Sequence, residues 1–200
     1  MSRPASSPTA PLQIDQTTVL SLLGMAAVLA TAYAFSLRVL PRSSGPKARA
    51  LFIWLLFDAL IRSIFEGSFL WNCFFVHAPH DPASSPSAFL PHNVHFLGRH
   101  DRTYGAAHGS GAFSLLWQEY ARADRRWAGT DLTLVSLEIP TVFIAGPLAL
   151  WCAVMVRRAE QDRDRARDSR KNVVGNNVGS VGNRRWFWMT VLATGELYGG

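Results

Sequence analysis

Charge is scarce in this chain of 200 residues, and its distribution is uneven. Only 17% of the residues are charged, against about 25% in a typical soluble domain. Residues 157–185 contain nine basic and four acidic side chains, which are 13 of the 34 charges in the chain. Disordered chains combine high charge with low hydrophobicity. A composition that is 48% hydrophobic therefore excludes a disordered chain.

Cysteine is scarce as well. Two cysteines cannot build the framework of a disulfide-stabilised secreted fold, and both lie in apolar contexts, where we interpret them as small hydrophobic residues. The formal net charge of +6 comes almost entirely from residues 157–185. A basic pI with this origin describes one segment rather than a nucleic-acid-binding surface, so we expect no nucleic-acid partner.

Long hydrophobic runs are what the chain does contain. A membrane-spanning helix needs roughly 20 apolar residues, and such runs occupy residues 16–37, 50–76 and 132–156. A buried soluble helix is the alternative for the first run, which is too long and begins with too little basic charge for a cleaved signal peptide. A fourth run begins at Trp186, and the chain ends after 15 residues of it, too few to cross a bilayer. These runs predict an all-α, multi-pass transmembrane helical bundle with three complete helices and a truncated fourth.

Basic residues in the connecting segments predict the orientation of the bundle. Cytoplasmic loops carry an excess of Lys and Arg, and residues 38–49 contain four basic residues and no acidic one. Residues 157–185 are the other basic segment, and the two lie on the same side if all three helices span. We therefore expect both basic loops to be cytosolic. Residues 77–131, with five Arg and five acids, should lie on the lumenal side together with the N-terminal tail.

The remaining segments are expected to be irregular. Residues 1–14 are rich in Ser, Pro and Ala and should form a disordered tail. Residues 77–112 and 159–185 are predicted as loop insertions in the domain that covers residues 15–200, and the second ends in a Gly/Asn linker. All six histidines lie within residues 77–108, in part as His-x-x-His pairs. Imidazole binds zinc, but such pairs in a Pro-broken loop have no fixed geometry, so we favour a structural or exposed loop and expect no metal.

Ionisable residues inside a spanning helix are candidate functional residues. Asp58, Arg62 and Glu66 follow one another at intervals of four, so they share one helix face. Glu138 and Thr141 share a face in the third run, and Pro140 opens the helix between them by removing one backbone donor. Two glutamates facing one apolar cavity suit proton transfer, in which one donates and the other accepts. The alternatives are an Arg62 neutralised between two carboxylates, and a Glu138 that only bridges helices by hydrogen bonds.

Several blocks spread along the chain resemble the emopamil-binding protein family, the EXPERA-domain group that includes sterol Δ8–Δ7 isomerase and the sigma-2 receptor. The residues that carry this resemblance are Glu66-Gly67-Ser68-Phe69, Leu116-Trp117-Gln118-Glu119-Tyr120-Ala121, Asp124-Arg125-Arg126-Trp127, Asp131, Glu138, Thr141, Gly146-Pro147-Leu148, Trp151 and Gly195-Glu196-Leu197-Tyr198-Gly199. They are distributed from about residue 20 to the end of the chain.

The resemblance implies a five-helix protein of the endoplasmic reticulum membrane that binds a sterol between its helices. It implies that the ring double bond moves from C8–C9 to C7–C8 by protonation and deprotonation, without a redox cofactor or metal. Glu66 and Glu138 would be the catalytic acid/base pair. The residues implied as substrate contacts are Thr141, Arg62, Trp117, Tyr120 and Trp127. The expected partners are a sterol, the lipid bilayer and, as a candidate, a second copy of the chain.

Two departures from the family pattern leave alternatives open. The family has a histidine four residues before the first of the two glutamates, and Arg62 stands there in this chain. A guanidinium stays protonated at physiological pH and cannot relay protons as an imidazole can. The family's fifth helix, with the Asn that it contributes to the sterol site, has no counterpart. The alternatives are a non-catalytic sterol- or amine-binding membrane protein and an inactive truncated paralogue.

Overall fold

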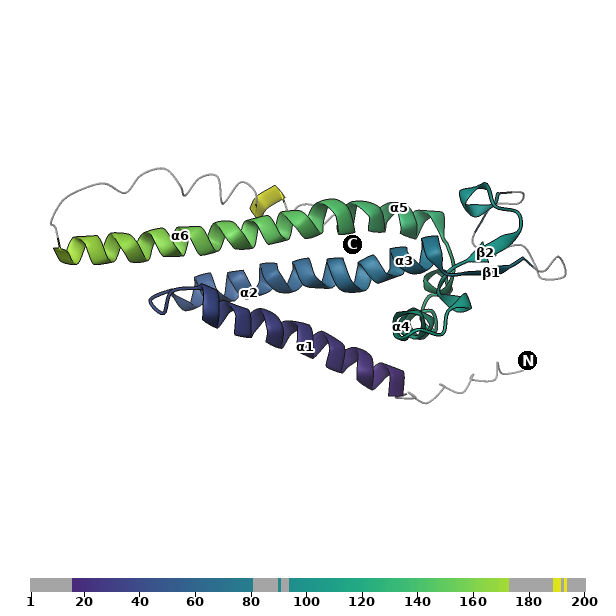
Figure 1. Cartoon of the computed structure of the whole chain (residues 1–200), viewed down its shortest axis with the longest axis horizontal. Helices are drawn as coiled ribbons and strands as arrows, with labels where there is room; N and C mark the ends of the chain where they lie inside the picture. The colour runs from purple at the N-terminus through teal and green to yellow at the C-terminus, as the bar shows by residue number, and fades with distance from the viewer. Residues whose placement is uncertain (1–15, 81–89, 91–93, 173–188, 192, 194–200) are drawn as a thin grey trace, which may run out of the picture.

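The computed structural model describes residues 16–80, 90, 94–172, 189–191 and 193 of the chain. Two long helical runs lie side by side along the molecule, and a third helix packs against them at one end (Figure 1). The expected N-terminal tail lies outside the described residues, as do all but residues 189–191 and 193 of the expected fourth helix. The elements of the three runs are α1 (Gln16–Val39), α2 (Pro46–Ile61), η1 (Arg62–Glu66), α3 (Gly67–Phe75), α5 (Leu132–Pro140), η5 (Thr141–Ala145) and α6 (Gly146–Asn172).

The core at one end of the molecule is built from small and branched side chains on α1, α2 and α6. Ala59 on α2 and Ala149 and Ala153 on α6 are buried, which allows the two helix backbones to approach closely. Arg49 in the first turns of α2 donates to the carbonyl oxygens of Ser36 and Pro41, at 3.0 and 3.3 Å. These bonds satisfy carbonyls at the C-terminal end of α1 and fix the turn between α1 and α2.

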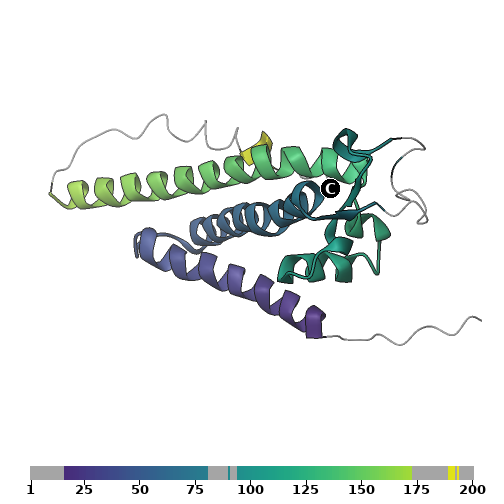
Figure 2. The same ribbon diagram turned by 45° about the vertical axis from the view of Figure 1, so that its right-hand side comes forward.

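Helix α1 diverges from α2 toward its N-terminal end, and α4 (Ala112–Tyr120) packs against both α1 and α3 there (Figures 1 and 2). Thr18 on α1 donates a hydrogen bond to the Glu119 carboxylate on α4 at 3.2 Å. Only 6% of the apolar window of α1 is buried inside the protein. Its remaining apolar side chains therefore face outward, as in a helix surrounded by lipid.

Among the residues that the structure describes, two helices are long and apolar enough to cross a membrane, namely Thr18–Val39 and the run Leu132–Ser169. The predicted second span, residues 50–76, forms the uninterrupted helical run from Pro46 to Phe75. It carries three ionisable residues on one face, Asp58, Arg62 and Glu66, which lowers its apolar character. The structure thus confirms a mainly helical fold with two candidate spans, and the third span stays a prediction.

The segment between the second and third runs is more ordered than the predicted loop. It contains β1 (His77–Pro79) paired antiparallel with β2 (Arg102–Tyr104), with His77 opposite Tyr104. Three short 3-10 turns accompany them, namely η2 (Phe96–Gly98), η3 (Ala106–His108) and η4 (Arg125–Ala128). Gly105 closes the turn with φ +131°, where a Cβ would lie 2.6 Å from the Ala128 carbonyl oxygen, so only glycine fits. Residues 81–89 and 91–93 of this predicted loop lie outside the described residues.

The prediction of a loop from residue 159 is wrong over its first part, because α6 continues to Asn172. Oppositely charged side chains three residues apart stabilise this helical extension. Glu160 pairs with Arg163 at 2.7 Å, and Asp162 pairs with Arg165 at 3.7 Å. Residues 173–185 of the predicted linker lie outside the described part of the chain.

Candidate functional site

The candidate site lies where two π-helical turns face each other. The turn η1 (Arg62–Glu66) joins α2 to α3, and the turn η5 (Thr141–Ala145) joins α5 to α6; the two turns are in contact. A π turn holds one residue more than an α turn, and such turns occur frequently at functional sites. The second turn directly follows Pro140, which has no N–H to pair with the Ser136 carbonyl oxygen. The helix around Glu138 is α-helical up to Pro140 and irregular from Thr141, so the predicted opening beside Glu138 stays a prediction.

Arg62 lies between two carboxylates on its own helix. Its Nε is 3.0 Å from Oδ1 of Asp58, and its NH1 is 3.7 Å from Oε2 of Glu66. All three side chains are largely buried, with exposed fractions of 13% for Arg62, 14% for Asp58 and 24% for Glu66. A buried guanidinium needs such partners because an unpaired charge in an apolar interior is very unfavourable. The predicted arrangement of an arginine between two carboxylates is confirmed.

Glu138 approaches this group from the opposite helix, through Thr141. The Thr141 hydroxyl lies 3.1 Å from Oε2 of Glu138 and donates to the Glu138 carbonyl oxygen at 2.8 Å. The same hydroxyl interacts with the Glu66 carboxylate, and the two glutamates interact electrostatically. Glu66, Glu138 and Thr141, which the sequence predicted as a group, are therefore brought together in space.

One oxygen of this cluster has no hydrogen bond. Oε2 of Glu66 is buried and lacks a donor within hydrogen-bonding distance among the residues that the structure describes, Arg62 being an ion-pair partner at 3.7 Å. Buried carboxylate oxygens are nearly always hydrogen-bonded in folded proteins. This atom is therefore a candidate contact for a bound molecule.

Two glycines permit the close approach of the facing turns. A Cβ on Gly146 would lie 3.4 Å from Cβ of Arg62, and a Cβ on Gly67 would lie 3.8 Å from Cγ1 of Val142. One methyl group would just fit at either position, whereas a larger side chain would separate the helices. The small residues therefore set the distance between the carboxylates of the two helices.

The three predicted aromatic residues form one cluster with Phe69, toward the end of the molecule that carries the β pair. Trp117 and Trp127 stack with ring centroids 5.0 Å apart and an interplanar angle of 15°, and the Tyr120 ring lies 5.2 Å from that of Trp117. Trp117 is 5% exposed and Tyr120 is 45% exposed. The burial of Trp117 among other rings indicates a core residue, whereas Tyr120 is accessible.

A buried polar network, which the sequence analysis missed, holds α3 beside Glu66. Trp117 donates from Nε1 to the Ser68 hydroxyl at 2.9 Å, and that hydroxyl donates to the Phe65 carbonyl oxygen at 2.6 Å. Asn72 donates to the Ser68 carbonyl oxygen at 2.8 Å and accepts from the Ser114 hydroxyl at 2.6 Å. A periodicity of polar residues in an apolar helix, Ser68 to Asn72, was the available signal.

Acidic residues near the β pair have structural partners. Asp131 caps α5 by accepting from the backbone N–H of Leu134 at 3.0 Å. Asp124 accepts from the backbone N–H of Arg126 at 3.0 Å and from its guanidinium at 2.6 Å. These bonds lower the pKa of the Asp124 carboxyl below its usual value, with the side-chain bond from Arg126 as the largest cause.

The described histidines gather loosely around the β pair. The rings of His95 and His100 lie 4.0 Å apart, and His77 contacts the Arg102 guanidinium at 3.2 Å. Among the described residues, no three His, Cys, Asp or Glu side chains are placed to hold a metal ion. His92 lies outside the described part of the chain.

Paired carboxylates and a hydroxyl on two facing, apolar helices are groups that can exchange protons or bind a cation, in a mainly helical chain with two candidate membrane spans among its described residues. Residues 112–200 match the family model EBP, described as EXPERA (EXPanded EBP superfamily). The resemblance to the emopamil-binding protein family is therefore confirmed for these residues, which include Glu138, Thr141 and the aromatic cluster from Trp117 to Trp127.

Part of the chain is also similar in sequence to an individual curated protein. Over 56 residues the chain is 39% identical to the 3-beta-hydroxysteroid-Delta(8),Delta(7)-isomerase of Cavia porcellus. This match covers 28% of the chain and 24% of the relative, so it spans about a quarter of that protein.

Proposed function

We propose that the protein is a sterol Δ8–Δ7 isomerase embedded in the endoplasmic reticulum membrane. The observation that carries the proposal is the convergence of Glu66 and Glu138 on the Thr141 hydroxyl across two facing π turns. The family match and the name of the relative from Cavia porcellus support the same activity. The substrate is a sterol with a double bond between C8 and C9.

The reaction requires one proton to be added and another to be removed. One glutamate gives a proton to C9, which leaves a cation centred on C8, and the other glutamate takes a proton from C7, so that the double bond forms between C7 and C8. General acid–base catalysis by positioned side chains contributes roughly 10²–10⁴-fold to a rate. Thr141 contacts both carboxylates and can orient them for the two transfers.

Arg62 is compatible with a cationic intermediate because Asp58 pairs with it. The two oxygens of Asp58 accept from Nε of Arg62 at 3.0 and 3.1 Å. The negative charge of Asp58 therefore offsets the positive charge of the guanidinium. The exposed ring of Tyr120 and the half-buried ring of Trp127 are proposed sterol contacts that stabilise the cation through their π faces.

The two basic segments support the proposed orientation, with the α1–α2 turn and the end of α6 in the cytosol. They meet at the same end of the molecule, where the Ser43 hydroxyl donates to Asp164 and Arg167 donates to the Ser43 carbonyl oxygen at 3.4 Å. Protease protection of sealed microsomes should leave the β pair intact and expose the end of α6.

Conversion of a Δ8 sterol in yeast that lacks its own isomerase tests the proposed activity. The chain should yield the Δ7 product, and Glu66→Gln and Glu138→Gln should each reduce the yield at least roughly 100-fold. Glu119→Gln is the matched control, because Glu119 bonds Thr18 and Arg122 outside the cluster. A stably expressed chain that gives no Δ7 product would exclude the proposal.

A second candidate function is non-catalytic binding of a sterol or an amphiphilic amine. The observation that favours it is the buried Oε2 of Glu66, which has no hydrogen bond among the described residues and would suit an ammonium group. Saturable binding of a radiolabelled cationic amphiphile should then be lost in the Glu66→Gln/Glu138→Gln double variant. Undiminished binding by that variant rules this function out.

A further inference from the structure

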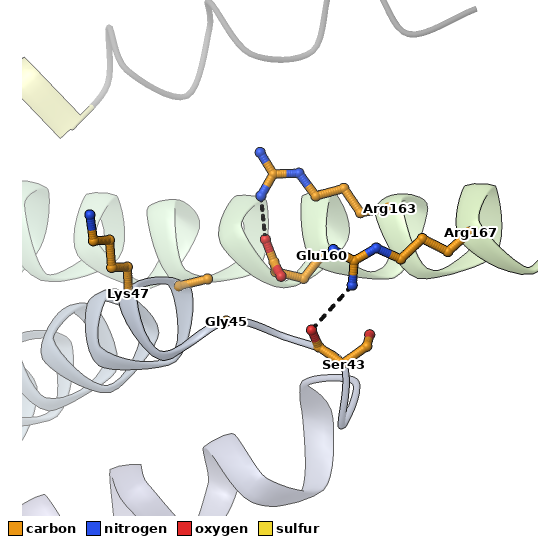
Figure 3. Close-up of a pocket in the computed structure, with 7 residues that line it drawn as sticks. Ser43, Gly45, Lys47, Glu160, Arg163 and Arg167 are labelled. Carbon is orange, nitrogen blue, oxygen red and sulfur yellow. Dashed lines mark hydrogen bonds and ion pairs between the residues drawn. The ribbon is translucent and has the colours of Figure 1, made fainter. Parts of the chain in front are cut away.

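A basic pocket of about 230 Å³ lies between the α1–α2 turn and the polar extension of α6 (Figure 3). The side chains that carry the argument are Lys47 from the first turn of α2, and Glu160, Arg163 and Arg167 from α6. This volume is smaller than the roughly 300–1,000 Å³ of sites for drug-sized ligands. It therefore suits a compact polar group rather than a whole sterol.

The charges in the pocket favour an anion. Three cationic side chains face one carboxylate, and that carboxylate is already used, since Arg163 donates to Glu160 at 2.7 Å. Arg167 reaches the Ser43 carbonyl oxygen at 3.4 Å, which holds its guanidinium at the rim of the pocket (Figure 3). The two remaining positive charges of Lys47 and Arg167 have no carboxylate opposite them among the residues that line the pocket.

The N-terminus of α2 adds backbone donors to the same pocket. Gly45 is the N-cap residue, so no side chain caps the helix, and Pro46 at the first position has no N–H. Ala48 and Gly45 line the pocket together with Lys47. The uncapped N–H groups of the first turn and the helix dipole both favour a negatively charged group there.

The end of the pocket nearer the apolar helices lies at the depth of lipid headgroups when the long helices are taken as membrane spans. The apolar part of the third run ends at Val156, and Glu160 follows by about 6 Å along the helix, whereas Arg163 and Arg167 follow by about 10 and 16 Å. The Arg167 side chain points back toward Glu160 (Figure 3). Each headgroup layer of a bilayer is roughly 5–8 Å thick. The apolar side chains of α1 end at the same level, at Val39 and Leu40, just before the turn that forms the pocket.

We propose that this pocket binds the phosphate headgroup of an anionic phospholipid from the surrounding leaflet. Lys47 and Arg167 bind the phosphate oxygens, the first turn of α2 donates backbone hydrogen bonds, and the acyl chains lie along the exposed apolar faces of the helices. Basic pockets between membrane helices on the cytoplasmic side are known to accept such headgroups. The inference rests on the membrane placement of the helices and not on the sterol chemistry.

Native mass spectrometry of the full chain, released from nanodiscs of phosphatidylcholine mixed with phosphatidic acid, tests the proposal. Wild type should retain phosphatidic acid in preference to phosphatidylcholine. The variant Lys47→Gln/Arg167→Gln should lose this retention roughly ten-fold or more, and it leaves the Glu160–Arg163 pair intact. The matched control, Arg157→Gln/Arg158→Gln, removes two exposed charges of α6 outside the pocket and should behave as wild type.

Each other outcome overturns the proposal. Equal losses in the two double variants would show general attraction of a basic surface to an anionic bilayer. Undiminished retention in the pocket variant would show that the lipid binds elsewhere. Competition by inorganic phosphate with the affinity of the lipid would assign the pocket to free phosphate. Sterol conversion is measured separately, so a failure here is distinguishable from a failure of the proposed isomerase.

Discussion

Arg62 donates from Nε to both carboxylate oxygens of Asp58, one helical turn earlier, at 3.0 and 3.1 Å. This pairing directs the guanidinium toward Asp58, whereas Oε2 of Glu66 is left with an ion-pair contact at 3.7 Å. The arginine of the proposed site is thereby held by a carboxylate that does not belong to the proposed catalytic pair.

Asp58→Asn should destabilise the protein, because it removes the carboxylate that accepts from Nε of the largely buried Arg62. Removing one partner of a buried ion pair lowers the free energy of unfolding by about 3–5 kcal/mol. Because the Asp58 side chain is 14% exposed, we expect a loss near the lower end of that range. Thermal unfolding in detergent measures the change. Asp101→Asn is the control, since the Asp101 side chain in its pair with Arg102 is 57% exposed and exposed ion pairs contribute little to stability. Equal shifts for both variants would contradict the inferred role of burial.

Thr141→Val should reduce sterol conversion while the fold persists. The substitution keeps the shape of the side chain and removes the hydroxyl that lies 3.1 Å from Oε2 of Glu138. Hydrogen bonds to charged groups contribute about 1.5–3 kcal/mol, which corresponds to roughly 10- to 100-fold in rate. Thr31→Val removes a hydroxyl that bonds the Ala27 carbonyl oxygen on the outward-facing α1 and should leave conversion unchanged. A variant at Thr141 with wild-type turnover would remove this hydroxyl from the mechanism.

Trp117→Ala should lower stability by roughly 3–5 kcal/mol, because it opens a cavity among Phe69, Tyr120 and Trp127. Trp71→Ala should cost far less, since Trp71 is 60% exposed and Trp117 is 5% exposed. Trp117→Phe separates ring packing from the hydrogen bond to Ser68 and should cost about 1 kcal/mol from the lost bond. Chemical denaturation in detergent compares the three variants, and similar losses at Trp117 and Trp71 would refute the assignment of Trp117 to the core.

The Asp124 carboxyl should make stability depend on pH in the acid range. Its pKa in the folded state is lowered, first by the side-chain hydrogen bond from Arg126 and then by the backbone N–H of the same residue. A lowered pKa means that the ionised form stabilises the fold above the unfolded value of about 3.9. The contribution is lost as the pH falls through the folded-state pKa. The difference in melting temperature between wild type and Asp124→Asn should therefore be present at neutral pH and shrink below about pH 4. A difference that does not change with pH would show that the charge has no role.

The sequence alone predicted the helical runs and the grouping of their polar residues. Intervals of four placed Asp58, Arg62 and Glu66 on one face, and the structure confirms this arrangement. The pairing of Glu66 with Glu138 across two helices followed from the rarity of carboxylates in apolar segments. The turns η1 and η5 bring the two helices into contact, and the role of the glutamates as a pair stays a prediction. Which side of the membrane each end faces stays a prediction.

Other features depend on contacts that local patterns do not contain. The pairing of His77 with Tyr104 joins residues far apart in the chain, so neither three-residue strand was evident. The charged run after Val156 contains no Gly or Pro before Gly175, and its opposite charges at intervals of three support a helix; its composition alone favoured a loop. The π turn at Arg62–Glu66 contains no proline that would have indicated it in the sequence.

The two π turns also decide where this architecture tolerates a change in chain length. Each holds one residue more than a regular turn, so the loss of one residue there would restore regular α-helical pairing and leave the helix uninterrupted. Because the extra residue of a π turn is taken up within the turn, its loss would leave the helix on either side in nearly the same orientation. Asp58 and Glu66 would then lie seven residues apart, about two turns, and would still share a face. A single-codon deletion at either turn would thus preserve an uninterrupted helix and remove only the widened turn at which the two helices meet.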